Sequence, residues 1–292
     1  MIKNVVKTYP HSEWRLLITP PKPGTLNMAI DEAILEFVGR GDLPPTLRLY
    51  AWDPPCLSLG YAQPLNDVDL DRLNQSGWDL VRRPTGGKAI LHTDELTYAV
   101  IAPHTEIRMA GSVLESYSRL SQALLLALQF LGVPANIRHK SKEVETSQKN
   151  GQIKYGQKNP GPVCFEEPST YEIIVNNKKL LGSAQARRKE GILQHGSLPL
   201  YGDLTRIIQV LKFSDEKTRV IAANRLLNRA TTIELVLGEK IDWKITAEAF
   251  SKAFQQVLNL ALQMAPITSK EETRAAELVM DKYENPTWTE RI

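Results

Sequence analysis

The 292-residue sequence has few of the features that mark metalloproteins, disulfide-rich proteins or nucleic-acid-binding proteins. It has only two cysteines, Cys56 and Cys164, and neither lies in a CxxC pair or in a Cys/His cluster with zinc-ligand spacing. The 36 Lys and Arg residues exceed the 33 Asp and Glu residues by only three, which indicates no strongly basic surface. We therefore expect no metal site, no disulfide framework and no nucleic-acid partner.

Long hydrophobic runs are also missing. The first residues, MIKNVVKTYPHSEWRLL, contain no apolar segment of the kind found in a secretory signal. The longest apolar run, over residues 123–131, is interrupted by Gln129 and falls well short of the roughly 20 residues that a membrane span requires. We therefore expect a soluble, cytoplasmic protein with no membrane partner.

Hydrophobic periodicity predicts strands and helices along most of the chain. Strands are expected over residues 13–18, 46–52, 56–61, 78–83, 95–102, 171–175, 179–187 and 192–200, and helices over 25–38, 67–74, 110–131, 247–262 and 271–283. Asn176-Asn177 is a favourable hairpin turn between two of these strands. Hairpin-joined strands followed by a helical part from about residue 203 favour an α+β layer fold. No linker or repeat divides the chain, so a single domain over residues 1–292 is expected.

A polar segment over residues 140–162 is rich in Lys, Gln, Asn, Gly and Ser and predicts a mobile loop. Loops of that length in compact domains are usually functional or disordered. The segment leads directly to Cys164, which a Pro168-Ser169 turn follows. A cysteine in this position is accessible to a substrate, but free cysteines are more often buried and inert. The residues alone favour the inert alternative for Cys164.

A second segment of interest is Arg82-Arg83-Pro84-Thr85-Gly86-Gly87-Lys88-Ala89, which ends at His92. Paired glycines let the backbone approach a ligand and offer N–H groups to an anion or a carbonyl. Flanking arginines bind phosphate or carboxylate groups. A hairpin turn with solvated charges explains the same residues equally well.

The strand expected after Asn177 begins with two lysines and continues into small residues. Alternation places Lys178 and Lys179 on opposite faces of this strand. Gly182-Ser183-Ala184 leaves room for a slender ligand against the sheet. On the next strand His195 is a candidate base, although a structural histidine is the commoner case.

These segments together resemble the biotin/lipoate ligase and transferase superfamily. The resemblance rests on Asn27-Met28-Ala29-Ile30-Asp31-Glu32, Arg82-Arg83-Pro84-Thr85-Gly86-Gly87, His92, Leu96-Thr97-Tyr98, Lys179-Leu180-Leu181-Gly182-Ser183-Ala184-Gln185 and His195-Gly196, in that order. Each motif alone is weak, but the ordered set is specific and extends nearly to Tyr283. The resemblance implies one α/β-layered catalytic domain with a central, largely antiparallel sheet flanked by helices.

Within the superfamily, Pro162-Val163-Cys164-Phe165 with Pro168-Ser169 and Tyr171-Glu172 resembles the LipM-type octanoyltransferases. That family loads an octanoyl group from octanoyl-acyl carrier protein onto the glycine-cleavage H protein in lipoate biosynthesis. The resemblance implies a thioester on Cys164, with Lys179 completing a catalytic dyad and no cofactor. It further implies that the acyl pocket is lined by Arg82, Arg83, Thr85, Gly86, Gly87, His92, Gly182, Ser183, Ala184 and His195.

Three other functions fit parts of the sequence. An ATP-dependent lipoate-protein ligase shares the fold, but Cys164 and the end of the chain soon after Trp288 favour the transferase. An amidotransferase that moves lipoyl groups between proteins would also depend on a cysteine. A non-catalytic module that binds carrier protein is disfavoured because Cys164, Lys179 and the Gly86-Gly87 turn occur together.

Overall fold

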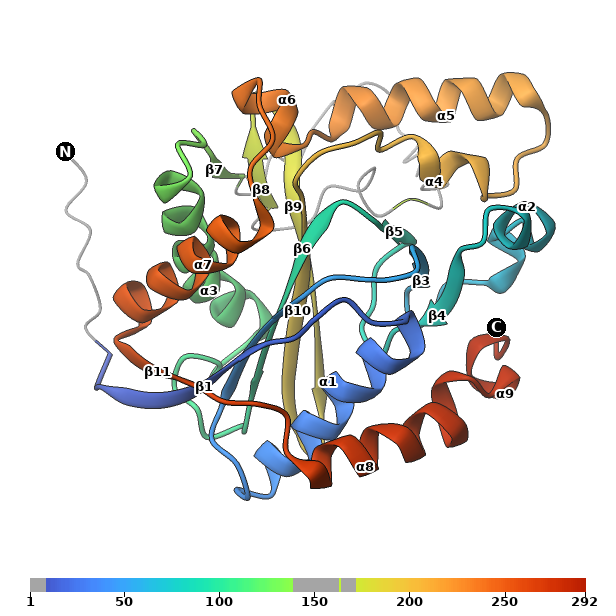
Figure 1. The fold of residues 1–292 in the computed structure, drawn as a ribbon. Helices are drawn as coiled ribbons and strands as arrows, with labels where there is room; N and C mark the ends of the chain where they lie inside the picture. Colours follow the sequence, from blue (N-terminus) through green and yellow to red (C-terminus); the bar gives the residue numbers. More distant parts are fainter. Residues whose placement is uncertain (1–8, 139–162, 164–171) are drawn as a thin grey trace, which may run out of the picture.

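The computed structural model describes residues 9–138, 163 and 172–292, and its centre is an eight-stranded sheet (Figure 1). In spatial order the strands are β11 (Leu260–Met264), β1 (Ser12–Ile18), β2 (Thr46–Tyr50), β6 (Glu95–Ala102), β10 (Gly191–Pro199), β9 (Lys178–Arg188), β8 (Glu172–Val175) and β7 (Asn136–Arg138). Strand β1 pairs in parallel with β11 and β2, and the remaining neighbours in the sheet pair antiparallel. The predicted α+β fold with a largely antiparallel sheet is therefore confirmed.

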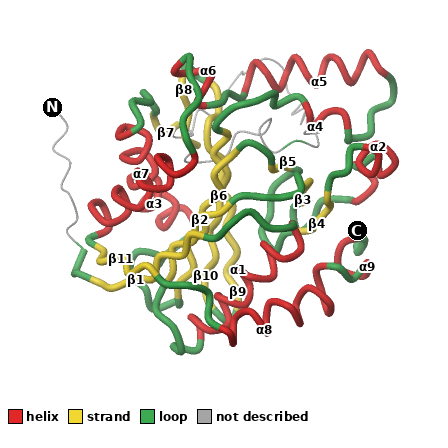
Figure 2. Tube along the Cα trace, in the orientation of Figure 1, coloured by secondary structure: helices red, strands yellow, loops and turns green. Residues whose placement is uncertain are grey.

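Helices cover both faces of this sheet, as the tube in Figure 2 shows. The long helices are α1 (Gly24–Gly39), α3 (Val113–Phe130), α5 (Glu216–Arg229), α7 (Trp243–Leu258) and α8 (Ser269–Leu278). Helices α3 and α7 pack against each other on one face, while α1 and α8 pack together on the other (Figure 1). No helix in the described part of the chain is long and apolar enough to cross a membrane.

Strand β6 shows why two hydrophobic layers form. Leu96, Tyr98 and Val100 belong to the core cluster under α3 and α7, whereas Ala99 and Ile101 belong to the cluster under α1 and α8. Successive side chains on a strand point to opposite faces, so a continuous apolar run serves both layers. All of β6 is buried.

A smaller sheet lies beside the main one and carries the Gly86-Gly87 turn. Its strands are β4 (Asp79–Arg82), β3 (Cys56–Leu59) and β5 (Ile90–His92), in that spatial order. Near it lie the short helices α2 (Leu70–Gln75), α4 (Arg206–Gln209) and α9 (Pro286–Thr289) and a single turn at Leu65–Asp67. The short helix α6 (Ile233–Leu237) packs against the core cluster under α3 and α7, and the turn at Val279–Tyr283 contacts α1 and α8. A third core cluster joins this sheet to α4 and α5.

The helix predicted over residues 247–262 is wrong at its C-terminal end. Helix α7 ends at Leu258, and Asn259 adopts a left-handed conformation with φ 51°. Residues 260–264 then form β11 beside β1, so the helical part expected from residue 203 contains a strand. Asparagine tolerates this conformation, and the free edge of β1 provides backbone partners that the local apolar pattern does not show. The short strands β5 and β7 were also not predicted.

The predicted hairpin turn at Asn176-Asn177 is confirmed. Both residues have positive φ, 47° and 63°, as a two-residue turn between antiparallel strands requires. The turn brings β9 back along β8. The turn therefore sets the pairing of β9 with β8, and this pairing determines which residues of β9 face the small sheet.

Candidate active site

A cavity with an empty volume of about 440 Å³ lies between the small sheet and the β9–β10 hairpin. It is lined by Met28, Tyr50, Trp52, Arg83, Gly87, Ile90, His92, Thr97, Gly182, Ser183, Ala184, His195, Gly196 and Ser197. Seven of the pocket residues expected from the sequence are in this lining: Arg83, Gly87, His92, Gly182, Ser183, Ala184 and His195. Only glycine fits at position 196, because a Cβ there would lie 2.6 Å from the Gly182 carbonyl oxygen and 2.6 Å from Tyr98 Cε1.

One wall of the cavity is organised by the buried carboxylate of Glu95. Its Oε1 lies 2.8 Å from His92 Nδ1 and accepts a 2.9 Å hydrogen bond from Ser197. Thr97 also donates to this oxygen. Burial alone would raise the pKa of Glu95, but His92 and the two hydroxyls lower it below its usual value. The carboxylate therefore stays ionised and holds His92 in one orientation.

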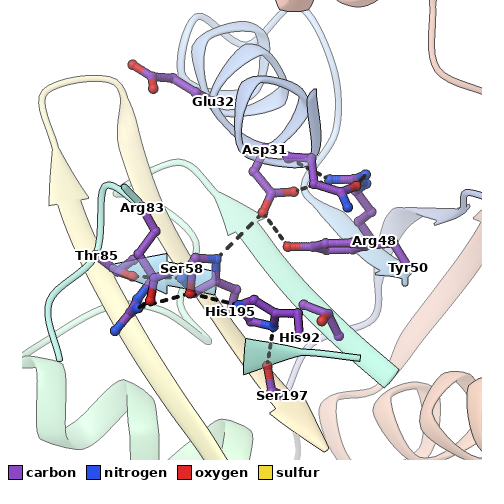
Figure 3. Close-up of polar contacts among 12 residues, drawn as sticks. Asp31, Glu32, Arg48, Tyr50, Ser58, Arg83, Thr85, His92, His195 and Ser197 are labelled. Atoms are coloured by element: carbon purple, nitrogen blue, oxygen red, sulfur yellow. Dashed lines mark hydrogen bonds and ion pairs between the residues drawn. The ribbon is translucent and has the colours of Figure 1, made fainter. Parts of the chain in front are cut away.

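A second buried network reaches the cavity from helix α1. Asp31 forms an ion pair with Arg48 at 2.7 Å and accepts a 3.0 Å hydrogen bond from the Tyr50 hydroxyl. The His195 Nδ1 atom lies 3.7 Å from Asp31 Oδ2, the same oxygen that accepts from Tyr50, while Arg48 pairs with Oδ1. Burial opposes ionisation of Asp31, but Arg48 and His195 lower its pKa overall. Figure 3 shows Asp31 directed at this network, while the neighbouring Glu32 points away from it.

His195 connects the α1 network to the glycine turn. Its Nε2 lies 2.7 Å from the Thr85 hydroxyl, immediately before Gly86-Gly87 (Figure 3). Burial lowers the pKa of His195, and the nearby Asp31 only partly offsets that effect. A neutral imidazole at neutral pH can both donate and accept hydrogen bonds. Thr85 contacts His195 but does not line the cavity itself, and Gly86 does not line it either.

The two arginines expected in the pocket have different positions. Arg83 lines the cavity, and its guanidinium donates to the carbonyls of Ser58, Gly86 and Lys88, which fixes the shape of the turn. Arg82 does not line it; its guanidinium donates to the carbonyls of Gly60, Gln63 and Thr289. Arg82 was expected to line the acyl pocket, and this expectation is wrong. Successive residues of an extended segment point to opposite faces, so only Arg83 faces the cavity.

Lys179 is buried and paired, which the sequence did not show. Its Nζ lies 3.0 Å from Glu172 Oε1, and both side chains are at most 6% exposed. Lys178, by contrast, is only half-buried and donates to the Leu227 carbonyl at 2.7 Å. The predicted placement of the two lysines on opposite faces is consistent with this difference in burial.

A β-bulge determines where Lys179 points. The register of β8 against β9 shifts between Ile173 and Ile174, and the adjacent Leu180 and Leu181 both enter the core under α3 and α7. When two neighbours share one face, the residues on either side of them, Lys179 and Gly182, face the opposite one. Gly182 lines the cavity, so Lys179 lies on the cavity face of β9.

Cys164 lies outside the described residues. Its chain neighbour Val163 is buried and forms an isolated parallel bridge with Ala89, just after the glycine turn. The other thiol, Cys56, is fully buried, and burial together with Asp79 and Glu95 raises its pKa well above the usual value. Cys56 packs against Gly24, where an added Cβ would lie 2.3 Å from its sulfur. Cys56 is therefore a core thiol.

Several site residues were not identified from the sequence. Asp31, Tyr98 and Glu172 occur in motifs that carried the family resemblance but were given no role, and Arg48, Tyr50, Trp52, Ser58, Glu95 and Ser197 were not assigned to the pocket. The available signal was charge in otherwise apolar strands: Arg48 lies within Leu47–Leu49, and such a residue needs a buried partner. Among the described residues, no group of His, Cys, Asp and Glu side chains is arranged as ligands for a metal ion.

The fold and this site define a class of protein. Residues 23–255 match the family model for the lipoyl protein ligase A/B catalytic domain, and the chain belongs to that family. A bipartite lipoate protein ligase from Thermoplasma acidophilum has a similar structure, with a TM-score of 0.76 and 26% identity over 96% of this chain and 97% of that one. A lipoate-protein ligase A bound with ATP is also similar, with a TM-score of 0.73 and 26% identity over 95% and 98% of the two chains.

Curated relatives narrow the comparison to one branch of the family. The octanoyltransferase LipM of Symbiobacterium thermophilum is 39% identical over 96% of this chain and 99% of its own. LipM of Brevibacillus brevis is 38% identical over the same shares of the two chains. The likeness covers nearly the full length on both sides.

Proposed function

We propose that this protein is an octanoyltransferase of lipoate biosynthesis that carries the acyl group on Cys164. The donor is octanoyl-acyl carrier protein, and the acceptor is a lysine on a lipoyl-accepting protein such as the glycine-cleavage H protein. Near full-length similarity to LipM octanoyltransferases supports the activity. The observation that carries the mechanism is Lys179, a buried lysine on the cavity face of β9.

Three features support pairing Cys164 with Lys179. Val163, the residue before Cys164, belongs to the same core cluster as Ala230, and Ala230 forms a bridge with Lys179. Val163 also forms a bridge with Ala89, next to strand β5 of the small sheet. The spacing of motifs around Cys164 is that of the LipM-type family. Together they support a dyad at the mouth of the acyl cavity.

The charge of Lys179 suits the first chemical step. A cysteine thiol with a pKa near 8.5 is only a few per cent thiolate at neutral pH. An ammonium group close to the thiol favours the thiolate and increases its reactivity. Glu172 keeps the lysine paired and in a fixed position before substrate binds.

The two-step transfer needs no separate activation of the acyl group. The Cys164 thiolate attacks the donor thioester, the carrier-protein thiol leaves, and one thioester replaces another. The acceptor lysine then attacks the enzyme thioester, forms an amide, and returns the thiol. The backbone N–H groups of the Gly86-Gly87 turn, which Arg83 holds in shape, are candidates for stabilising the oxyanion.

The test is intact-mass spectrometry of the protein mixed with octanoyl-acyl carrier protein in the absence of ATP. We expect one octanoyl adduct on wild-type protein and none on Cys164→Ser. Cys56→Ser is the matched control, because its thiol is buried with a raised pKa and should not take the acyl group. A labelled Cys164→Ser protein would contradict the thioester, and transfer that requires ATP would indicate a ligase instead.

A further inference from the structure

The Gly86-Gly87 turn at the edge of the acyl cavity is supported by β3 and the residue that follows it. At Gly60, directly after β3, an added Cβ would lie 1.8 Å from the Gly87 carbonyl oxygen, so only glycine allows this close approach. The carbonyls of Gly86 and Lys88 each accept a 2.8 Å hydrogen bond from Arg83 Nη2. Neither glycine N–H donates a hydrogen bond to a residue that the structure describes. These N–H groups therefore meet no acceptor there that would compete with an oxyanion.

The side chain of Ser58 joins Arg83 to the buried imidazole of His92 (Figure 3). Ser58 lies on β3 and is fully buried. Its hydroxyl oxygen accepts a 3.1 Å hydrogen bond from Arg83 Nη1 and lies 2.8 Å from His92 Nε2. The Ser58 carbonyl accepts a second bond from the same guanidinium nitrogen, at 3.0 Å. One nitrogen of Arg83 is thus bound to Ser58, and the other is bound to the glycine turn.

The hydrogen bonds of this chain run in one direction when His92 is neutral. The ionised Glu95 only accepts, so the ring proton of His92 is on Nδ1, which lies 2.8 Å from the Glu95 carboxylate. His92 Nε2 is then an acceptor, and Ser58 donates its hydroxyl proton to it. The lone pairs of the Ser58 oxygen remain for Arg83, which can only donate. A buried network in which each group has one role holds a single arrangement.

We propose that Ser58 is a positioning residue for acyl transfer, which couples the buried His92 to Arg83 and so fixes the shape of the Gly86-Gly87 turn. This inference rests on the proposed function and adds to it a residue that does not line the cavity. The guanidinium of Arg83 is planar, so the contacts on its two terminal nitrogens depend on each other. Without the Ser58 hydroxyl, Arg83 loses one of the contacts that set this plane, and the turn is held less firmly.

The test measures steady-state transfer from octanoyl-acyl carrier protein by Ser58→Ala. We expect kcat to fall by about 10-fold, which is less than the roughly 10²- to 10³-fold loss caused by removing an oxyanion donor itself. KM should be unchanged, because a contact that matters only in the transition state affects kcat. Ser58→Thr keeps the hydroxyl and should restore most of the rate.

Ser121→Ala is the matched control. Ser121 is also buried, and its hydroxyl donates a 3.0 Å hydrogen bond to the Ser118 carbonyl on α3. Its loss removes a buried hydroxyl away from the cavity and should leave kcat unchanged. Thermal melting shows whether each variant folds. If Ser58→Ala does not fold, Ser58→Cys replaces it, and we expect a smaller loss in kcat with the same unchanged KM.

A double variant tests whether Ser58 acts through Arg83. Arg83→Lys replaces the planar guanidinium with a single ammonium group, which cannot bind Ser58 and the turn at once. Adding Ser58→Ala to Arg83→Lys should therefore cause little further loss in kcat, because residues of one network are not additive. Losses in kcat that multiply in the double variant would overturn the coupling.

Two further results separate this inference from the proposed function. A folded Ser58→Ala protein, or Ser58→Cys where that replaces it, in which kcat is unchanged or the loss lies in KM overturns the role of Ser58 alone. A wild-type protein that transfers no octanoyl group from carrier protein overturns the proposed function itself.

Discussion

Lys179 Nζ lies 3.0 Å from Glu172 Oε1, and the ion pair is buried beside a bulge that directs the lysine to the cavity face of its strand. Because two charges removed from water need each other, this pair fixes the position of the lysine side chain. Its immediate chain neighbour Lys178 is half-buried and donates a hydrogen bond to the Leu227 carbonyl.

The first prediction contrasts these two lysines. We expect Lys179→Ala to lower the rate of octanoyl transfer by about 10²- to 10⁴-fold, as loss of a group that assists proton transfer does. Lys178→Ala should change the rate little, because Lys178 lies on the opposite face of β9 from Lys179 and donates to the Leu227 carbonyl. Single-turnover transfer rates test this, with thermal melting to show that both variants fold. Equal losses in the two variants would refute the assignment.

The second prediction concerns the buried pair of Asp31 and Arg48. Asp31→Asn leaves the fully buried Arg48 guanidinium without its counter-ion, and we expect a loss of about 3–5 kcal/mol in the free energy of unfolding. Glu36→Gln, on the same helix, breaks the partly exposed pair with Arg274 and should cost less than about 1 kcal/mol. Denaturant unfolding measures both. Similar costs would show that Asp31 and Arg48 are not a coupled buried pair.

The third prediction follows from the lowered pKa of His195. The folded protein binds a proton at this ring less readily than the unfolded chain does. The stabilisation is therefore complete above the usual pKa of about 6.5 and is lost as pH falls towards the folded-state value. Wild-type protein should lose stability on acidification over this range, and His195→Asn should lack that loss.

Thermal melting of the two proteins between neutral pH and about pH 5 tests the third prediction. The difference in Tm between wild type and His195→Asn should shrink as pH falls. His104→Asn, which removes an exposed imidazole, is the control and should track the wild type. A constant difference for His195→Asn would contradict the linkage.

The fourth prediction tests the different position of Arg82. Its guanidinium and its backbone carbonyl both hold α9, by donating to the Thr289 carbonyl and by accepting from Trp288 Nε1. Arg82→Met removes the first contact and leaves carbonyl groups without a donor, at a cost of about 1–3 kcal/mol. Faster hydrogen exchange at Pro286–Thr289 with an unchanged KM for octanoyl-acyl carrier protein would confirm a structural role. A raised KM would place Arg82 in substrate binding.

Much of the fold could be predicted from local patterns. Periodicity identified α1, α3, β1 and β6, because each has a strong apolar signal over its whole length. It failed at β11, where a strand forms only because the edge of β1 is available. Local propensity cannot report a partner that lies about 250 residues away in the chain, as Ser12 and Leu260 do.

The candidate site was likewise predictable from the sequence only in part. Motif order alone identified Lys179, the glycine turn and the small residues Gly182 to Ala184 as site residues, and the structure places the turn and the small residues around one cavity. Nothing in the local pattern distinguished Arg82 from Arg83. That choice depends on strand β4, whose two faces meet the cavity and the C-terminal segment respectively.

The sequence by itself determined the family, the order of most elements and the residue types that the chemistry requires, because these depend on motifs and on short-range periodicity. Only the tertiary structure decided that Lys179 is paired with Glu172 and that His92 is held by Glu95. Each of these relationships joins residues through buried contacts between different elements. Burial sets their strength, and burial exists only once the layers have packed.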